Sequence, residues 1–142
     1  WQVDNEYLFG SDMLVAPFFE NQSARSVYLP PGNWIDYQNG KVYSGGWNTI
    51  KADEIPAVVL VREGAAIPHI KLAQSTAFMD WSSLELIVYA AESKNAHALV
   101  CLPSELRLYK LALSQQGDQF RLTSDPLDGK VKWTIRHKKS GR

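Results

Sequence analysis

The sequence has 142 residues, which is enough for one hydrophobic core of ordinary size or for two very small ones. Apolar residues make up 45% and charged residues 21%, proportions that exclude an intrinsically disordered chain. Fifteen basic residues balance fifteen acidic ones, so the chain has no overall charge that would attract nucleic acid or an anionic membrane.

Short apolar runs in the first part of the chain predict β-strands. Residues 13–19, MLVAPFF, form an apolar run in which the proline indicates an edge strand or a bent strand. Residues 25–30, RSVYLP, alternate between the two faces, with Val27 and Leu29 on one of them. The Pro-Pro-Gly that follows predicts a change of chain direction.

Residues 33–47, NWIDYQNGKVYSGGW, predict a hairpin that is rich in aromatic residues. Asn39-Gly40 is typical of the centre of a type I′ turn, in which both central residues take a positive φ. The aromatic rings either fill the inside of a β-sheet protein or offer a stacking platform to a sugar, and we favour a structural role. The four rings belong to Trp34, Tyr37, Tyr43 and Trp47.

The second part of the chain also reads as strands. Residues 57–62, AVVLVR, are β-branched and typical of a buried strand, whereas residues 68–83 have little pattern and predict a linker or a surface excursion. Residues 84–91, 97–102, 105–113 and 119–124 predict further strands. Residues 129–138, GKVKWTIRHK, have the cleanest alternation, with Val131, Trp133 and Ile135 inward and Lys132, Thr134 and Arg136 outward.

About ten short strands with frequent turns, and no convincing amphipathic helix, predict an all-β protein, most simply an antiparallel β-sandwich. No apolar run approaches the length of roughly 20 residues that spans a membrane, and no secretory segment is visible. The chain begins with Trp1 rather than Met, so we expect it to be processed or cut from a longer protein.

The residues that usually carry chemistry are scattered. His69, His97 and His137 lie far apart and lack the close spacing of a zinc site, and Cys101 has apolar neighbours typical of an inert, buried thiol. No glycine-rich phosphate loop and no G-x-S-x-G motif is present. The carboxylates lie in turn-like surroundings, so we expect no catalytic residue, no metal and no cofactor in this chain.

Three ordered motifs carry a resemblance to a known family. NEYLFGSDMLVAPFFE, VYLPPGNWIDYQNGKVYSGG and DEIPAVVLVREGAAIP resemble the run that follows the catalytic barrel in glycoside hydrolase family 31, which includes α-glucosidases and α-xylosidases. The corresponding elements are residues 7–10, 14–17, 28–36 and 55–68. The match covers about half of the chain, in order and with similar spacing.

The resemblance implies a non-catalytic C-terminal β-sandwich region without its barrel. The parent enzyme would hydrolyse α-linked glucosides or xylosides with two aspartates of the barrel, so this chain alone would be inactive. Its partners would be the barrel of the same polypeptide and, through the parent, a carbohydrate substrate. Residues 1–92 would form a proximal sandwich, and residues 93–142 would add strands to it or form a short distal β module, because the acidic, aromatic motif of many members is absent.

The resemblance also implies a docking surface near the start of the chain. Residues 1–12 would lead in from the barrel, with Tyr7, Leu8 and Phe9, and also Met13, packing against it. Without the barrel, residues 1–20 would fray, self-associate or fold into the sandwich's own core. The alternative from another class is a free-standing carbohydrate-binding module that uses the hairpin aromatics Trp34, Tyr37, Tyr43 and Trp47.

Overall fold

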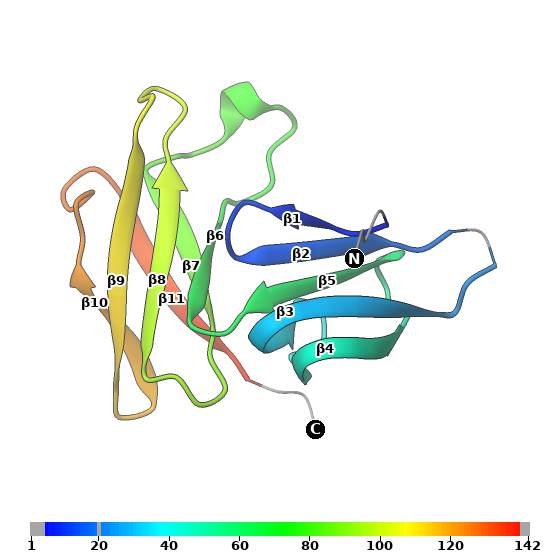
Figure 1. Ribbon diagram of the computed structural model, residues 1–142. Helices are drawn as coiled ribbons and strands as arrows, with labels where there is room; N and C mark the ends of the chain where they lie inside the picture. Colours follow the sequence, from blue (N-terminus) through cyan, green and yellow to red (C-terminus); the bar gives the residue numbers. More distant parts are fainter. Residues whose placement is uncertain (1–4, 20, 140–142) are drawn as a thin grey trace. The chain divides into compact units, whose positions relative to one another are not determined.

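The computed structural model describes residues 5–19 and 21–139, and within them the regular structure is eleven β-strands and one short 3₁₀ helix (Figure 1). The strands form one five-stranded and one six-stranded sheet. The predicted all-β class is confirmed, and the two sheets are consistent with a β-sandwich protein.

The five-stranded sheet is built from the first part of the chain. It contains β1 (Tyr7–Phe9), β2 (Met13–Pro17), β3 (Ala24–Asp36), β4 (Val42–Lys51) and β5 (Ala57–Arg62). The strand order is β1-β2-β5-β3-β4, and each pairing is antiparallel. Strand β3 changes register between Leu29 and Asn33, so that only its second half pairs with both β4 and β5.

The change of register in β3 coincides with the predicted Pro-Pro-Gly break. A Cβ atom on Gly45 of β4 would lie 2.9 Å from the backbone of both Pro30 and Pro31, so this position requires glycine. The side chains on one face of the sheet form its core, with the fully buried Trp34 among them. The other buried members are Leu14, Ala16, Val27, Leu29, Ile50, Val58 and Leu60.

The hairpin between β3 and β4 closes differently from the prediction. Gly40 has a φ of 76°, but the φ of Asn39 is not positive, so the predicted type I′ turn is wrong. The loop comprises residues 37–41, and the Gly40 N–H donates to the Asp36 carbonyl at 2.9 Å. The Asp36 carboxylate accepts hydrogen bonds from the backbone N–H groups of Gln38 (2.8 Å) and Asn39 (3.2 Å). A buried aspartate side chain therefore organises the turn.

The six-stranded sheet has its own hydrophobic core. It contains β6 (Ala65–His69), β7 (Ser83–Tyr89), β8 (Asn95–Cys101), β9 (Leu108–Gln116), β10 (Gln119–Ser124) and β11 (Lys132–Lys138). The order is β10-β9-β8-β6-β7-β11. The β6–β8 and β7–β11 pairings are parallel, so the sheet is mixed rather than purely antiparallel. The 3₁₀ helix, Thr76–Phe78, lies in the weakly patterned segment before β7.

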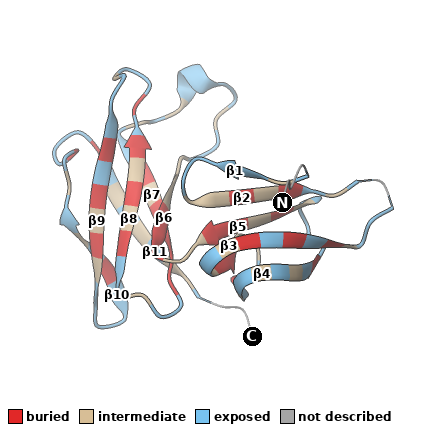
Figure 2. Ribbon diagram, in the orientation of Figure 1, coloured by how far each residue is buried: buried red, intermediate tan, exposed pale blue. Residues whose placement is uncertain are grey.

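The two edge strands of this sheet approach each other. The rings of Phe120 in β10 and His137 in β11 meet edge to face at 5.2 Å, which indicates that the sheet curls around its core. The alternation predicted for β11 is confirmed: Val131 is buried, Trp133 and Ile135 are half-buried against the core, and the residues between them are exposed. Figure 2 shows the same alternation along the strands of both sheets.

The chain divides into two compact units between Glu63 and Gly64. Each unit contains one of the sheets and one of the two cores, and Lys139 groups with the first unit. The division expected at residues 92 and 93 falls between β7 and β8, which belong to the same sheet.

Candidate docking face

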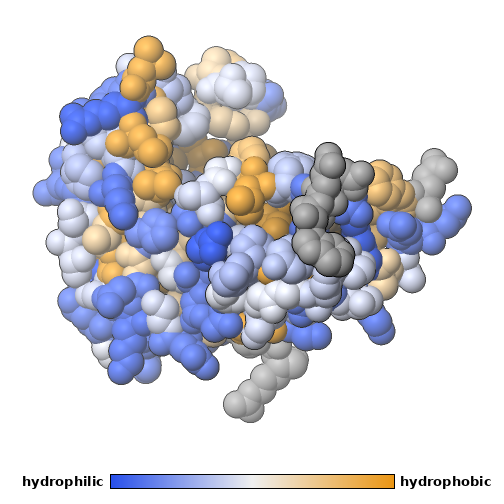
Figure 3. Space-filling view, in the orientation of Figure 1, coloured by the Kyte–Doolittle hydropathy of each residue, from blue (hydrophilic) through white to orange (hydrophobic). Residues whose placement is uncertain are grey.

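Strand β1 presents three apolar side chains to solvent. Tyr7 is 54% exposed, Leu8 is 50% exposed and Phe9 is 66% exposed, although β1 is paired with β2 along its whole length. Because successive side chains of a strand point to opposite faces, Leu8 lies on one face of the sheet and Tyr7 and Phe9 lie on the other. Figure 3 shows hydrophobic surface in the region of β1.

The register with β2 defines the surface around these residues. Tyr7 lies opposite Val15 and Phe9 lies opposite Met13, and both β2 residues are half-buried. Together these four side chains form an apolar patch at the sheet edge, which we call the β1 face. Leu8 lies opposite Leu14, a core residue, but it is not itself part of that core.

Polar contacts hold the chain that leads into β1. The buried guanidinium of Arg25 donates to the Asn5 carbonyl at 2.6 Å and to the Pro17 carbonyl. The Glu6 carboxylate accepts a hydrogen bond from the Tyr28 N–H at 3.2 Å. Burial raises the pKa of Glu6, and the Tyr28 N–H and the charge of Arg25 offset part of that rise. The start of β1 is thus fixed to β2 and β3 while its side chains remain exposed.

The structure places the predicted docking residues in one hairpin, with Leu8 on the opposite face from the other three. Tyr7, Leu8, Phe9 and Met13 all belong to the β1–β2 hairpin, and none of them is buried. Residues 1–4 and 20 of the segment expected to dock or to self-associate lie outside the described residues.

The four hairpin aromatics do not share one surface. Trp34 is buried, donates from its indole nitrogen to the Pro30 carbonyl at 3.0 Å, and lies under the guanidinium of Arg62. Tyr43 packs against the core and has the ammonium of Lys41 over its ring, and Tyr37 is half-buried. Of the four, only Trp47 is largely exposed, at 59%.

The sequence did not predict the aromatic ring that packs against Trp47. Tyr28 lies directly opposite it across the β3–β4 pairing, and the two rings meet edge to face with centroids 5.4 Å apart. The alternation of residues 25–30 already put Tyr28 on the face opposite Val27 and Leu29. That Tyr28 lies opposite Trp47 follows only from the register of β3 against β4, which shifts after Leu29.

Several carboxylates stabilise turns by accepting hydrogen bonds from nearby backbone N–H groups. Asp36, Asp80 and Asp125 each accept a hydrogen bond from the backbone N–H two residues later, at 2.8, 3.0 and 2.9 Å. Among the residues that the structure describes, no three His, Cys, Asp or Glu side chains gather in a way that could hold a metal ion. No helix in the described residues is long and apolar enough to cross a membrane.

The predicted burial of Cys101 is wrong. Its side chain is exposed, and its thiol approaches the Glu105 carbonyl at 3.4 Å. The neighbouring apolar residues Val100 and Leu102 are buried, and the alternation of the strand places Cys101 on the opposite side.

The chain resembles known proteins in both sequence and fold. Residues 1–67 match the family model of the glycosyl hydrolase family 31 C-terminal domain. The chain is 33% identical over 99 residues to the alpha-xylosidase XylQ of Lactiplantibacillus pentosus, a match over 67% of this chain and 13% of the relative. It is 36% identical over 82 residues to Alpha-glucosidase 2 of Bacillus thermoamyloliquefaciens, which covers 56% of this chain and 10% of that protein.

A solved structure shares the fold over nearly the whole chain. The alpha-xylosidase of Xanthomonas citri matches with a TM-score of 0.68 and 21% identity, covering 99% of this chain and 17% of that protein. The chain thus spans only about a tenth to a sixth of the proteins it matches. Residues 1–67 thus match the C-terminal domain of glycosyl hydrolase family 31, and the chain is similar in sequence to enzymes named as alpha-xylosidases and alpha-glucosidases.

Proposed function

We propose that the chain is a non-catalytic C-terminal region of a larger α-glycosidase and that its β1 face packs against the catalytic barrel of that enzyme. The observation that carries the proposal is the exposure of Tyr7 and Phe9 on one face of a strand that is itself held in place. Large apolar side chains gathered on one exposed strand are typical of a surface that another surface covers.

The size of the match supports this assignment. The relatives named as an alpha-xylosidase and an alpha-glucosidase are several times longer than the part that this chain matches. The parent enzyme would accordingly hydrolyse α-linked xylosides or glucosides with residues outside this chain. The aspartates that hold turns here serve the fold, which agrees with a supporting role rather than a catalytic one.

The energetic gain from covering the β1 face would be substantial for a surface of this size. Burying a large apolar side chain contributes about 1.5–3 kcal/mol, and more than half of the surface of Tyr7 and of Phe9 is still accessible. Covering these two side chains would contribute on the order of 2 kcal/mol in total. Loss of this contact would lower the stability of the parent enzyme without touching its reacting groups.

The test uses the parent enzyme. The gene's reading frame upstream of Trp1 should encode a catalytic barrel, and the full-length enzyme should be made with Tyr7→Ser and Phe9→Ser together. We expect a lower melting temperature with little change in KM, because the substitutions weaken the contact between this region and the barrel.

The matched control is Phe78→Ser, which removes an exposed aromatic ring from the other unit. An upstream frame without a barrel would contradict the proposal. So would a double variant that melts at the same temperature as the wild type, or a control variant that is destabilised to the same extent.

A further inference from the structure

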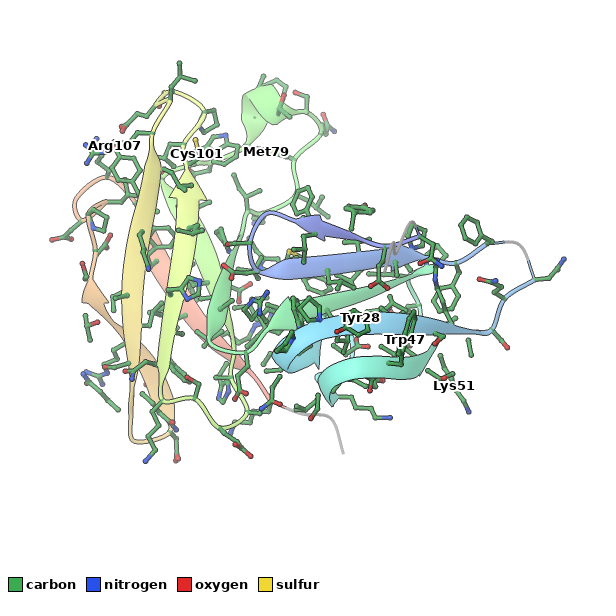
Figure 4. All side chains as sticks on the ribbon, viewed as in Figure 1. Tyr28, Trp47, Lys51, Met79, Cys101 and Arg107 are labelled. Atoms are coloured by element: carbon green, nitrogen blue, oxygen red, sulfur yellow. The ribbon has the colours of Figure 1, made fainter. Side chains whose placement is uncertain are left out.

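A second surface of the first unit combines aromatic rings with hydroxyl groups. Along β3 and β4, the side chains between the core residues point away from the core and form the outer face of the strand pair. The core residues on the opposite face include Val27, Leu29 and Ile50. We call this surface the Trp47 face. Its exposed residues are Ser26 and Tyr28 of β3 and Trp47, Thr49 and Lys51 of β4. Tyr28, Trp47 and Lys51 are labelled in Figure 4.

The Trp47 ring is held by its neighbour and remains open to solvent. Tyr28 meets it at an interplanar angle of 63°, so the two rings touch edge to face rather than covering each other. Trp47 keeps 59% of its surface exposed, and Tyr28 keeps 40%. A planar apolar surface is therefore presented to solvent in a fixed orientation.

Polar groups lie at a suitable distance along the same face. Ser26 lies directly opposite Thr49, and this pair is two residues along the strands from Tyr28 and Trp47. Two residues of a strand span about 7 Å, which puts two hydroxyl groups within reach of a sugar ring that stacks on the indole. Hydroxyl groups both donate and accept hydrogen bonds, as the hydroxyls of a sugar require.

The charge of the Trp47 face favours a neutral ligand. Its five side chains include one cation, Lys51, and no carboxylate. One lysine is too little for a polyanion, whose binding depends on several phosphate contacts. A ligand with one apolar face and a rim of uncharged hydroxyl groups fits this surface.

The size of the apolar part argues against a separate protein partner, which, unlike the barrel proposed for the β1 face, would not be joined to this chain. A buried aromatic side chain covers about 150–250 Å², so the exposed parts of Trp47 and Tyr28 amount to roughly 200 Å². A stable protein interface takes about 800 Å² from each partner. The Trp47 face matches the area of one or two sugar rings.

We propose that the Trp47 face binds a neutral oligosaccharide, with one pyranose ring stacked on the Trp47 indole, Tyr28 supporting the indole, and Ser26 and Thr49 bonding to sugar hydroxyls. The preference for α-linked glucosides rests on the proposed function, because the parent enzyme would act on sugars of that class. The site would hold a glycan chain close to the enzyme and would take no part in hydrolysis.

The test is a nuclear magnetic resonance titration of the ¹⁵N-labelled chain with maltoheptaose and, separately, isomaltoheptaose. We expect saturable shifts centred on the Trp47 indole N–H and on the amides of β3 and β4 around Tyr28, with millimolar affinity. Trp47→Ala should weaken binding at least about tenfold, a loss of about 1.4 kcal/mol. Tyr28→Phe keeps the supporting ring and should bind like the wild type.

Phe78→Ala is the matched control, since it removes an exposed aromatic ring from the other unit. Thermal unfolding of each variant checks that the fold is retained. Absence of saturable shifts with both sugars, shifts centred elsewhere, or equal binding by Trp47→Ala would overturn the proposal. These outcomes do not depend on docking to a barrel, and failure of the Tyr7 and Phe9 test would leave them unchanged.

Discussion

The guanidinium of Arg25 is buried, and its described hydrogen bonds go to the backbone carbonyls of Asn5 and Pro17. It also lies over the ring of Phe19 at 5.2 Å. One side chain thus joins the segment before β1, the end of β2 and the first half of β3. Because a buried cation requires such partners, Arg25 fixes the position of β1 and, with it, the orientation of the β1 face.

Glu6 gives this region a pH dependence. Its pKa lies above the ordinary value of 4.5, chiefly because burial disfavours the charged carboxylate. The folded state therefore binds the proton more tightly than the unfolded state, and the free energy of unfolding should fall as pH rises from 4.5 through the raised pKa. Glu6→Gln keeps an acceptor for the Tyr28 N–H but cannot ionise. Its free energy of unfolding should therefore not show the decrease with pH that the ionisation of Glu6 causes.

Denaturant unfolding of wild type and Glu6→Gln across this pH range measures the difference. Glu54→Gln, an exposed glutamate of the same unit, is the control and should follow the wild type. A Glu6→Gln variant whose stability runs parallel to that of the wild type would contradict the assignment.

Trp133 tests the core of the second unit. It is half-buried against that core, and its indole Nε1 is buried without an acceptor among the described residues. Trp133→Ala should lower the free energy of unfolding by about 3 kcal/mol, which is near the low end of the range for replacing a core aromatic side chain by alanine. Trp133→Phe keeps most of the apolar contact and removes the unsatisfied donor, so it should be nearly neutral. A loss under about 1 kcal/mol for the alanine variant would mean that Trp133 does not support the core.

At the scale of elements, β1 is a short edge strand with uncovered side chains on both faces of the sheet. Edge strands with exposed apolar residues readily pair with other chains. β1 is paired with β2 and its leading segment is held by Arg25, so we expect association rather than fraying when no barrel is present.

Self-association should be visible in light scattering of the chain. The mass of the wild type should exceed the monomer mass of 16.0 kDa and rise with concentration. Tyr7→Ser with Phe9→Ser should restore the monomer, while Phe78→Ser should behave like the wild type. A wild type that remains at 16.0 kDa at high concentration would contradict this prediction.

Local patterns predicted the elements better than their connections. The alternation of residues 129–138 placed Val131 inward and Lys132 outward, because a strand with one buried face must alternate. The parallel pairing of β7 with β11 joins segments about fifty residues apart, and no local pattern specifies such a contact. The turn at Asn39 escaped prediction for a related reason, since the side chain of Asp36 decides its conformation.

At the scale of the whole molecule, the chain contains two sheets with separate cores, and the family match covers the first of them. The β1 face and the Trp47 face both belong to this first unit. The region that resembles the family therefore carries both proposed contacts, one to the barrel and one to a glycan. The motifs quoted from the sequence located the β1 face, whereas the Trp47 face emerged only from the register of β3 against β4.

The chain alone should show no glycosidase activity. The carboxylates Asp36, Asp80 and Asp125 hold turns, and the catalytic aspartates would belong to the barrel. The assay uses aryl α-glucosides and aryl α-xylosides at high protein concentration. Turnover that survives purification and disappears when one Asp or Glu of this chain is replaced would show that the chain has an active site of its own.

Hydrogen exchange at β1 distinguishes a β1 face that is covered by a barrel from one that is not. The amides of residues 7–9 should be compared in the chain at low concentration and in the full-length parent enzyme, with the central strand β5 as the internal reference. We expect exchange at residues 7–9 to be slower in the parent than in the chain alone, because a three-residue edge strand opens locally more easily when no barrel covers the β1 face. Equal exchange at residues 7–9 in the two proteins would contradict the claim that this face docks on a barrel.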